Sequence, residues 1–89
     1  MITKVNHLGI AVRDLEQAAK TLKEAFGLDV SSVLEVSSQK VRVAFVPVGE
    51  TRLELLEPTC EDSAVAKFLA SKGEGLHHVA LETTDVAKG

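Results

Sequence analysis

The chain has 89 residues, of which 45% are hydrophobic and 26% are charged, and its formal net charge is −3. This length accommodates one domain with a modest core, and the composition excludes an intrinsically disordered chain. The negative charge, without any Lys/Arg cluster, disfavours a nucleic-acid partner, and no apolar run is long enough to cross a membrane. Cys60 is the single cysteine, so no internal disulfide can form and we expect a cytoplasmic protein without membrane attachment.

The first segment predicts a strand followed by a helix. Residues 4–12 alternate in character and are rich in β-branched and aliphatic side chains, which is typical of a strand. Asp14 is a candidate N-cap, and Gln17 completes a capping-box pattern three residues later. Apolar residues then recur at helical spacing as far as Phe26, and Gly27 suits the left-handed residue that ends a helix.

Three further strands are expected in the middle of the chain. Residues 29–38 can supply a short strand that is weakened by its serines. Residues 40–48 predict a stronger strand, and residues 51–58 predict another that is closed by Pro58.

A second helix and a last strand follow. Residues 61–73 predict the helix, with Asp62 or Ser63 as its cap. Residues 75–83 predict the last strand, and Asp85 would cap a third helix for which the chain has little room.

The end of the chain repeats its beginning. When "GLHHVALETTDVAKG" is placed on "VNHLGIAVRDLEQAA" at an offset of 71 residues, His78 meets His7 and Asp85 meets Asp14. We interpret the chain as one βαβββ unit followed by the start of a second copy. The fold class is therefore α+β, with a first βαβββ module at 1–57, a helical connector at 58–75 and the start of a second, incomplete module at 76–89.

Alternation along the strands predicts two different faces of the sheet. One face should be bulky and apolar and pack against both helices; it would carry Leu8, Ile10, Val12, Val41, Val43, Phe45, Leu53, Leu55, Val79 and Leu81. The other face should mix small residues with His, Glu and Arg; it would carry His7, Gly9, Ala11, Arg42, Ala44, Arg52, Glu54, Leu56, His78, Ala80 and Glu82. Small residues beside such groups indicate a concave face that holds a small ligand, a metal, or both.

His7, Glu54 and His78 lie on three different strands and share the small and polar face in this register. Two imidazoles and one carboxylate suit Co²⁺, Mn²⁺, Ni²⁺, Fe²⁺ or Zn²⁺. Neighbours on a strand point to opposite faces, so only one residue of the pair His77–His78 is expected in the cleft, and the repeat selects His78. Each candidate taken alone is more often a surface or hydrogen-bonded residue. Because histidine recurs at the same position of both copies of the repeat, a metal site is favoured over that alternative.

The remaining polar residues receive plainer interpretations. Arg42, Arg52 and Glu82 are expected to be exposed strand residues. Cys60 lies beside two acidic residues that disfavour a thiolate, so it is not expected to be a nucleophile. The sequence assigns no catalytic residue and no organic cofactor site.

Three segments carry a family resemblance: "HLGIAVRDLEQA…FGL", "KVRVAFVPVGETRLELLEP" and "SAVAKFLASKGEGLHHVALETTDV". They resemble the methylmalonyl-CoA epimerases of the vicinal-oxygen-chelate (glyoxalase/bleomycin-resistance/dioxygenase) superfamily, and the resemblance covers essentially the whole chain. It implies a glyoxalase-like fold of paired βαβββ modules around a divalent metal. It also implies His7, Glu54 and His78 as three of four protein ligands, the fourth being a Glu beyond Gly89. A second base of some family members would fall at Arg42.

The activity that the resemblance implies is epimerisation at C2 of a malonyl-type CoA thioester. A proton leaves one face of C2 and returns on the other, while a chelated metal stabilises the enolate. The chain would be an N-terminal portion of such an enzyme, or a half-length protein completed as a homodimer or strand-exchanged assembly. Two alternatives stay open: a metal-free small-molecule-binding module of the same fold, and another metalloenzyme of the superfamily such as a glyoxalase-type lyase.

Overall fold

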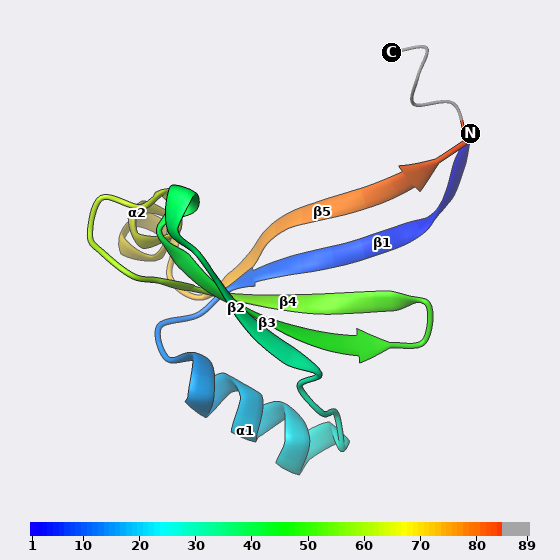
Figure 1. Cartoon of the computed structure of the whole chain (residues 1–89), viewed down its shortest axis with the longest axis horizontal. Coiled ribbons are helices and arrows are strands. Elements are labelled where there is room, and N and C mark those ends of the chain that lie inside the picture. Colours follow the sequence, from blue (N-terminus) through cyan, green and yellow to red (C-terminus); the bar gives the residue numbers. More distant parts are fainter. Residues whose placement is uncertain (85–89) are drawn as a thin grey trace.

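The computed structural model describes residues 1–84, which form a five-stranded mixed sheet with two α-helices (Figure 1). In chain order the elements are β1 (Ile2–Ala11), α1 (Leu15–Phe26), β2 (Ser32–Val36), the short 3-10 helix η1 (Ser37–Gln39), β3 (Val41–Val48), β4 (Thr51–Pro58), α2 (Ala64–Lys72) and β5 (Gly75–Thr83). The expected α+β class is confirmed, as is the order of strands and helices. Asp85 and the third helix that it would cap lie outside the described residues.

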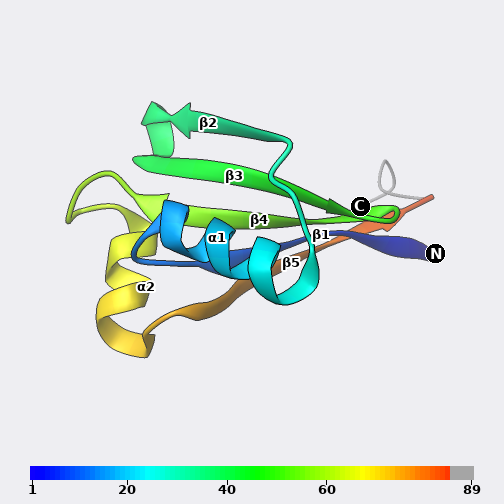
Figure 2. The ribbon, with the colours of Figure 1, turned by 90° about the horizontal axis from the view of Figure 1, so that it is seen from below.

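The strands lie in the order β2-β3-β4-β1-β5 (Figure 2). β1 is parallel to β4 and antiparallel to β5, and the β2–β3 and β3–β4 pairs are antiparallel. The first strand of the chain therefore lies directly beside the strand that repeats its sequence. This pairing brings the two ends of the described chain together.

Both helices begin and end as their capping residues predict. The Asp14 side chain accepts a hydrogen bond from the Gln17 backbone N–H at 3.0 Å, and Gly27 ends α1 with φ of 70°. The N-cap of α2 is Ser63, the second of its two candidate caps, whose hydroxyl accepts from the Ala66 N–H at 3.0 Å. Neither helix within residues 1–84 is long and apolar enough to span a membrane.

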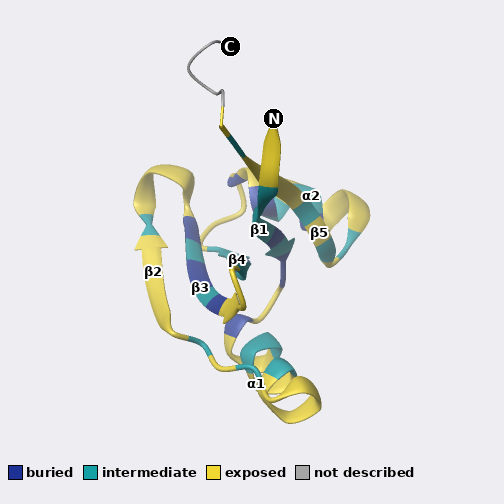
Figure 3. Ribbon diagram, turned by 90° about the vertical axis from the view of Figure 1, so that its right-hand side faces the viewer, coloured by how far each residue is buried: buried dark blue, intermediate teal, exposed yellow. Residues whose placement is uncertain are grey.

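The core is divided between the two faces of the sheet (Figure 3). The cluster beneath α1 contains Val12, Leu15, Ala44, Val46 and Leu55. The cluster beneath α2 contains Ala11, Val41, Val43, Leu56, Val65 and Leu69. The expectation that both helices pack on one face is therefore wrong, because α1 and α2 cover opposite faces.

The assignment of faces was also wrong for β3. In the antiparallel β3–β4 pair, Phe45 lies opposite Glu54 and Ala44 lies opposite Leu55. Residues directly opposite each other point to the same face. The bulky side chains of β3 therefore share the face of Glu54, and Arg42 shares the face of α1. Alternation groups the residues of one strand, but only pairing decides which face each group joins.

Candidate metal centre

Four strands present one residue each in a row on the α2 face of the sheet. Phe45 of β3 lies opposite Glu54 of β4, Glu54 opposite Gly9 of β1, and Gly9 opposite His78 of β5. His7 lies two residues before Gly9 and shares its face. The three candidate ligands thus surround the one position in the row that has no side chain.

Gly9 leaves the space that the His78 ring occupies. A Cβ atom on Gly9 would lie 2.2 Å from Cε1 of His78 and 2.6 Å from its Nε2. These distances are far below van der Waals contact, so the ring can lie over the backbone of β1 only because residue 9 is glycine.

The two imidazoles meet through the same ring atom. Nε2 of His7 lies 3.1 Å from Nε2 of His78, and the ring planes are 89° apart. Two nitrogens bound to one ion by bonds of about 2.1 Å are separated by roughly 2.9 to 3.4 Å for octahedral to tetrahedral angles. The separation of the two histidines therefore already fits a shared ion.

Glu54 lies on the expected face but contacts other groups. Its side chain is only 12% exposed, and its carboxylate accepts a hydrogen bond from Arg52 Nε at 2.9 Å and lies 3.4 Å from Nδ1 of His7. Within residues 1–84, no hydrogen bond joins Glu54 to His78. Arg52 shares the face of Glu54 as expected, but it was expected to be a plain exposed strand residue, and its ion pair with Glu54 was not predicted.

Both His77 and His78 line the cavity on this face, contrary to the expectation that only one could. The pairing of β1 with β5 shifts here, because Gly9 pairs with His78 while Ile10 pairs with Leu76. His77 is therefore the extra residue of a β-bulge, which interrupts the alternation of side chains. No pattern in a single strand announces such a bulge.

His77 is held between its neighbour and α2. Its ring contacts Phe68 edge-on with centroids 5.0 Å apart, and its Nδ1 lies 2.9 Å from Nδ1 of His78. Burial, followed by the nearby His78, lowers the pKa of His77 below its ordinary value. The neutral form of this imidazole is therefore favoured.

A cavity of about 540 Å³ opens beside the histidines, between α2 and strands β3 to β5. Its lining includes the following side chains: Val36, Lys40, Val41, Val43, Phe45, Glu54, Leu56, Asp62, Val65, His77 and His78. β3 contributes only apolar residues to this lining. The cavity therefore combines an apolar wall with imidazole and carboxylate groups at one end, as in many small-ligand sites.

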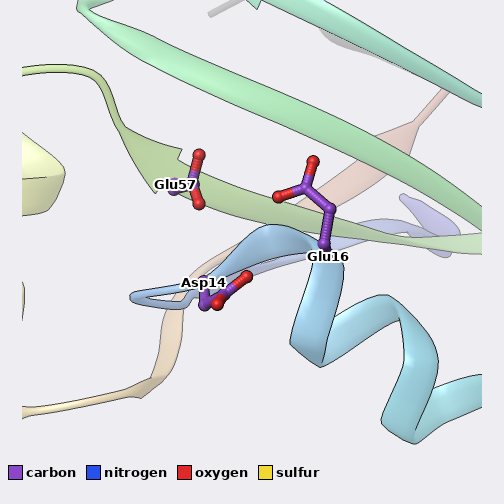
Figure 4. Close-up of side chains that lie close together, drawn as sticks. All are labelled: Asp14, Glu16 and Glu57. Atoms are coloured by element: carbon purple, nitrogen blue, oxygen red, sulfur yellow. The ribbon is translucent and has the colours of Figure 1, made fainter.

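Arg42 lies on the other side of the sheet, where it pairs with Glu16 and Glu57. Figure 4 shows these two carboxylates together with that of Asp14. Asp14, Glu16 and Glu57 have ligand atoms within 4.8 Å of one another. Arg42 donates to Glu16 at 2.6 Å and to Glu57 at 2.9 Å, and the Glu16 hydrogen bond raises the pKa of Arg42. Glu57 also accepts from the Leu15 backbone N–H at 2.9 Å. Arg42 thus pairs with two of the three carboxylates, and Glu57 links the start of α1 to the sheet.

The expectation that Arg42 stands at the position of a base beside the metal is therefore wrong. The residues that β3 turns toward the cavity are Val41, Val43 and Phe45, none of which can accept a proton.

Comparison with known proteins places this geometry in a family. The family model described as the Glyoxalase/Bleomycin resistance protein/Dioxygenase superfamily matches residues 6–89. Human mitochondrial methylmalonyl-CoA epimerase is 40% identical over 84 residues, which are 93% of this chain and 48% of that protein. An ethylmalonyl-CoA/methylmalonyl-CoA epimerase of Cereibacter sphaeroides is 37% identical over 87 residues, 97% of this chain and 65% of that protein.

Solved structures agree with the sequence relatives. A methylmalonyl-CoA epimerase in complex with methylmalonyl-CoA and NH4⁺ superposes with a TM-score of 0.90 at 39% identity, covering 99% of this chain and 65% of that one. The methylmalonyl-CoA epimerase of Mycobacterium tuberculosis superposes at 0.89 with 29% identity, covering 98% and 59%. The chain spans about half the length of several curated relatives that it matches. It belongs to the Glyoxalase/Bleomycin resistance protein/Dioxygenase superfamily.

Proposed function

We propose that this chain forms part of a methylmalonyl-CoA epimerase, which moves the proton at C2 of a malonyl-type CoA thioester from one face to the other. The observation that carries the proposal is the His7–His78 pair, whose Nε2 atoms lie 3.1 Å apart beside an apolar cavity. Relatives named as epimerases of this substrate class align with most of the chain.

A divalent metal would be held by His7 and His78 through Nε2 and by Glu54 through its carboxylate. The ligand types suit such an ion, and Gly9 gives the His78 ring the room to lie beside His7. When bound, the metal supplies Lewis-acid stabilisation of the enolate oxygen. Among Co²⁺, Mn²⁺, Ni²⁺, Fe²⁺ and Zn²⁺, the donor set favours none.

The residues of this chain have separate tasks around that ion. The apolar side chains Val43, Phe45 and Leu56 line the cavity and would exclude water from C2. Arg52 holds the Glu54 carboxylate on the site face. The chain offers no group of β3 that could take the proton, so the acid and base at C2 stay unassigned.

One observation favours a second function. The Glu54 carboxylate is engaged by Arg52 and by Nδ1 of His7. This arrangement satisfies the charge of Glu54 without an ion. It supports the alternative of a metal-free module that binds small molecules in the same cavity.

Elemental analysis of the purified chain, after dialysis against each divalent ion, separates the two functions. We expect about one ion per site in the wild type and loss of that ion in His7→Ala, His78→Ala and Glu54→Gln. Glu35→Gln, which changes an exposed strand carboxylate of β2, is the matched control. A wild type without bound metal, or an unchanged metal content in both histidine variants, would contradict the metal site.

Epimerase activity has its own measurement. If the chain holds both the metal and the proton-transfer groups, deuterium from the solvent should enter C2 of methylmalonyl-CoA. Metal binding without exchange would retain the metal site but show that this chain alone lacks the proton-transfer groups.

The assembly, the location and the module boundaries stay predictions. β5 has an unpaired outer edge within residues 1–84, and it exposes Leu76, Val79 and Leu81. An open edge with apolar residues favours pairing with another strand, so we propose a homodimer or strand-exchanged assembly. Light scattering after size-exclusion chromatography measures the oligomeric state, and a well-folded monomer would contradict the proposed assembly. Modules at 1–57 and 76–89 agree with the sequence repeat. A cytoplasmic location agrees with the single cysteine, although several named relatives are mitochondrial.

A further inference from the structure

The pairing of β1 with β5 also shifts on the β1 side, immediately before His7. Val5 pairs with Leu81 of β5, whereas His7 pairs with Ala80. Asn6 is therefore the extra residue between these two pairs, just as His77 is the extra residue before His78. A bulge changes the direction of the side chain that it carries.

The two bulges are equivalent under the repeat of 71 residues. Asn6 corresponds to His77, and the pair Val5–Leu81 corresponds to the pair Leu76–Ile10. The repeat thus extends beyond the candidate ligands to the irregularities of the backbone. In each copy, a polar side chain on a bulge precedes the histidine.

Asn6 fixes the tautomer of His7. Its Nδ2 donates to Oε1 of Glu82 at 3.1 Å, and a carboxylate can only accept. The amide oxygen of Asn6 therefore faces His7, at 2.8 Å from its Nδ1. Because that oxygen also only accepts, Nδ1 of His7 carries the proton and Nε2 keeps its lone pair.

His77 plays the corresponding part with a more adaptable group. Its Nδ1 lies 2.9 Å from Nδ1 of His78, a hydrogen-bond distance that requires a proton on one of the two nitrogens. A neutral imidazole can donate or accept at Nδ1, depending on its tautomer. His77 can therefore support either tautomer of His78, while Phe68 holds its ring in place.

We propose that Asn6 and His77 are positioning residues that hold Nδ1 of the following histidine and direct both Nε2 atoms to one point. That this point binds a metal rests on the proposed function; the hydrogen bonds themselves do not. Partners of this kind orient ligating imidazoles in metal sites and set their tautomers.

The 3.1 Å contact between the Nε2 atoms assigns the protons of the metal-free chain. His7 accepts at Nε2 from Nε2–H of His78, and His78 accepts at Nδ1 from Nδ1–H of His77. An ion requires the lone pair of His78 Nε2. The His78 proton then resides on Nδ1, and the His77 proton resides on Nε2, so each ring stays neutral with one proton before and after.

Imidazole nitrogen NMR on the ¹⁵N-labelled chain tests this inference, at about pH 8.5, well above the ordinary pKa of a free imidazole. In the metal-free wild type we expect His7 as the Nδ1–H tautomer and His78 as the Nε2–H tautomer. Addition of Zn²⁺, a diamagnetic probe, should convert His78 to the Nδ1–H tautomer and leave His7 as it was. A metal-free His7 protonated at Nε2 would overturn the proposal.

Variants test the positioning effect on affinity. Asn6→Leu and His77→Phe should each raise the Kd for Zn²⁺ by roughly 10- to 100-fold, the range seen for such partners. Asn6→Asp and His77→Gln retain acceptors at these positions and should restore much of the affinity. Ser38→Ala changes a cavity-lining residue that has no hydrogen bond to a histidine within residues 1–84 and should have no effect.

The failure of each proposal has a different signature. A wild type that binds no Zn²⁺ overturns the metal site, while the tautomer of His7 in the metal-free chain still decides the role of Asn6. Zn²⁺ binding with an unchanged Kd in Asn6→Leu and His77→Phe overturns the positioning roles and leaves the metal site standing. Circular dichroism of each variant identifies any that fail to fold, and the two rescue variants then carry the comparison.

Discussion

His7 and His78 meet at their Nε2 atoms, 3.1 Å apart, although 71 residues separate them in the sequence. The contact arises because β1 and β5 are antiparallel neighbours and because the register pairs His7 with Ala80 and Gly9 with His78. Under the repeat offset of 71 residues, His7 corresponds to His78 and Ala80 corresponds to Gly9, so each of these two pairs is equivalent to the other. The histidines therefore approach from opposite sides of a local twofold axis that passes between Leu8 and Val79.

Gly9→Ala should weaken metal binding more than folding. The new Cβ would overlap the His78 ring, and this exposed ring can rotate away because solvent lies beside it. We expect the Kd for Zn²⁺ to rise roughly tenfold or more as one ligand is displaced, with a small change in thermal midpoint. Titration calorimetry and thermal denaturation measure the two effects. Val79→Ala, on the other face of β5, is the control, and an unchanged Kd for Gly9→Ala would contradict the role of the glycine.

Arg42→Met should destabilise the attachment of α1 to the sheet. The substitution leaves three carboxylates close together and removes the guanidinium that hydrogen-bonds two of them, Glu16 and Glu57. Repulsion among these charges should lower the thermal midpoint, and the loss should shrink in high salt. Arg42→Lys should recover only part of the lost thermal midpoint, because an ammonium lacks the planar arrangement of donors of a guanidinium. Equal stability of Arg42→Met and wild type at low salt would count against this network.

Ser63→Ala should destabilise the fold through the start of α2. Ser63 is 2% exposed, and its hydroxyl accepts from the Ala66 N–H at 3.0 Å. Loss of such a cap costs about 0.5 to 2 kcal/mol of unfolding free energy. Chemical denaturation measures the loss, and Ser71→Ala near the other end of α2 should cost less. A Ser63→Ala variant as stable as Ser71→Ala would show that the cap is dispensable.

The pKa of Asp62 should depend on two neighbours. The Cys60 thiol hydrogen bond, followed by the Lys40 ion pair, lowers this pKa from 3.8 to about 2. A lowered pKa in the folded state gives stability that is present above the unfolded value near 4 and is lost as the pH falls toward 2. Cys60→Ala and Lys40→Gln should each raise the pKa toward 3.8, as carboxyl NMR titration would show. A pKa that stays near 2 in both variants would contradict these causes.

Local signals in the sequence were sufficient for the elements and their ends. Asp14 and Gly27 bound α1 as their capping chemistry requires, and residues 51–58 and 75–83 form strands with the expected bounds. Each of these signals acts between residues that are close in the chain. The repeat goes further, because it relates His7 to His78 across 71 residues of the chain.

Pairing between strands decided what alternation could not. The sequence grouped Val41, Val43 and Phe45 correctly as sharing one face, but only the register with β4 placed them beside Glu54. The bulge at His77 likewise depends on how β5 pairs with β1, and it turned an expected outward residue toward the cavity.

The sequence by itself determined the order of the elements, the helix caps and the pair of equivalent histidines, because these depend on local chemistry and on the repeat. The tertiary structure decided which side chains of each strand face α1 and which face α2. It also decided which carboxylates Arg42 and Arg52 contact, and that Asn6 and His77 hydrogen-bond the imidazoles next to them. Those features arise from the registers between strands distant in the chain. A shift of one residue in any register would move every side chain of that strand to the other face.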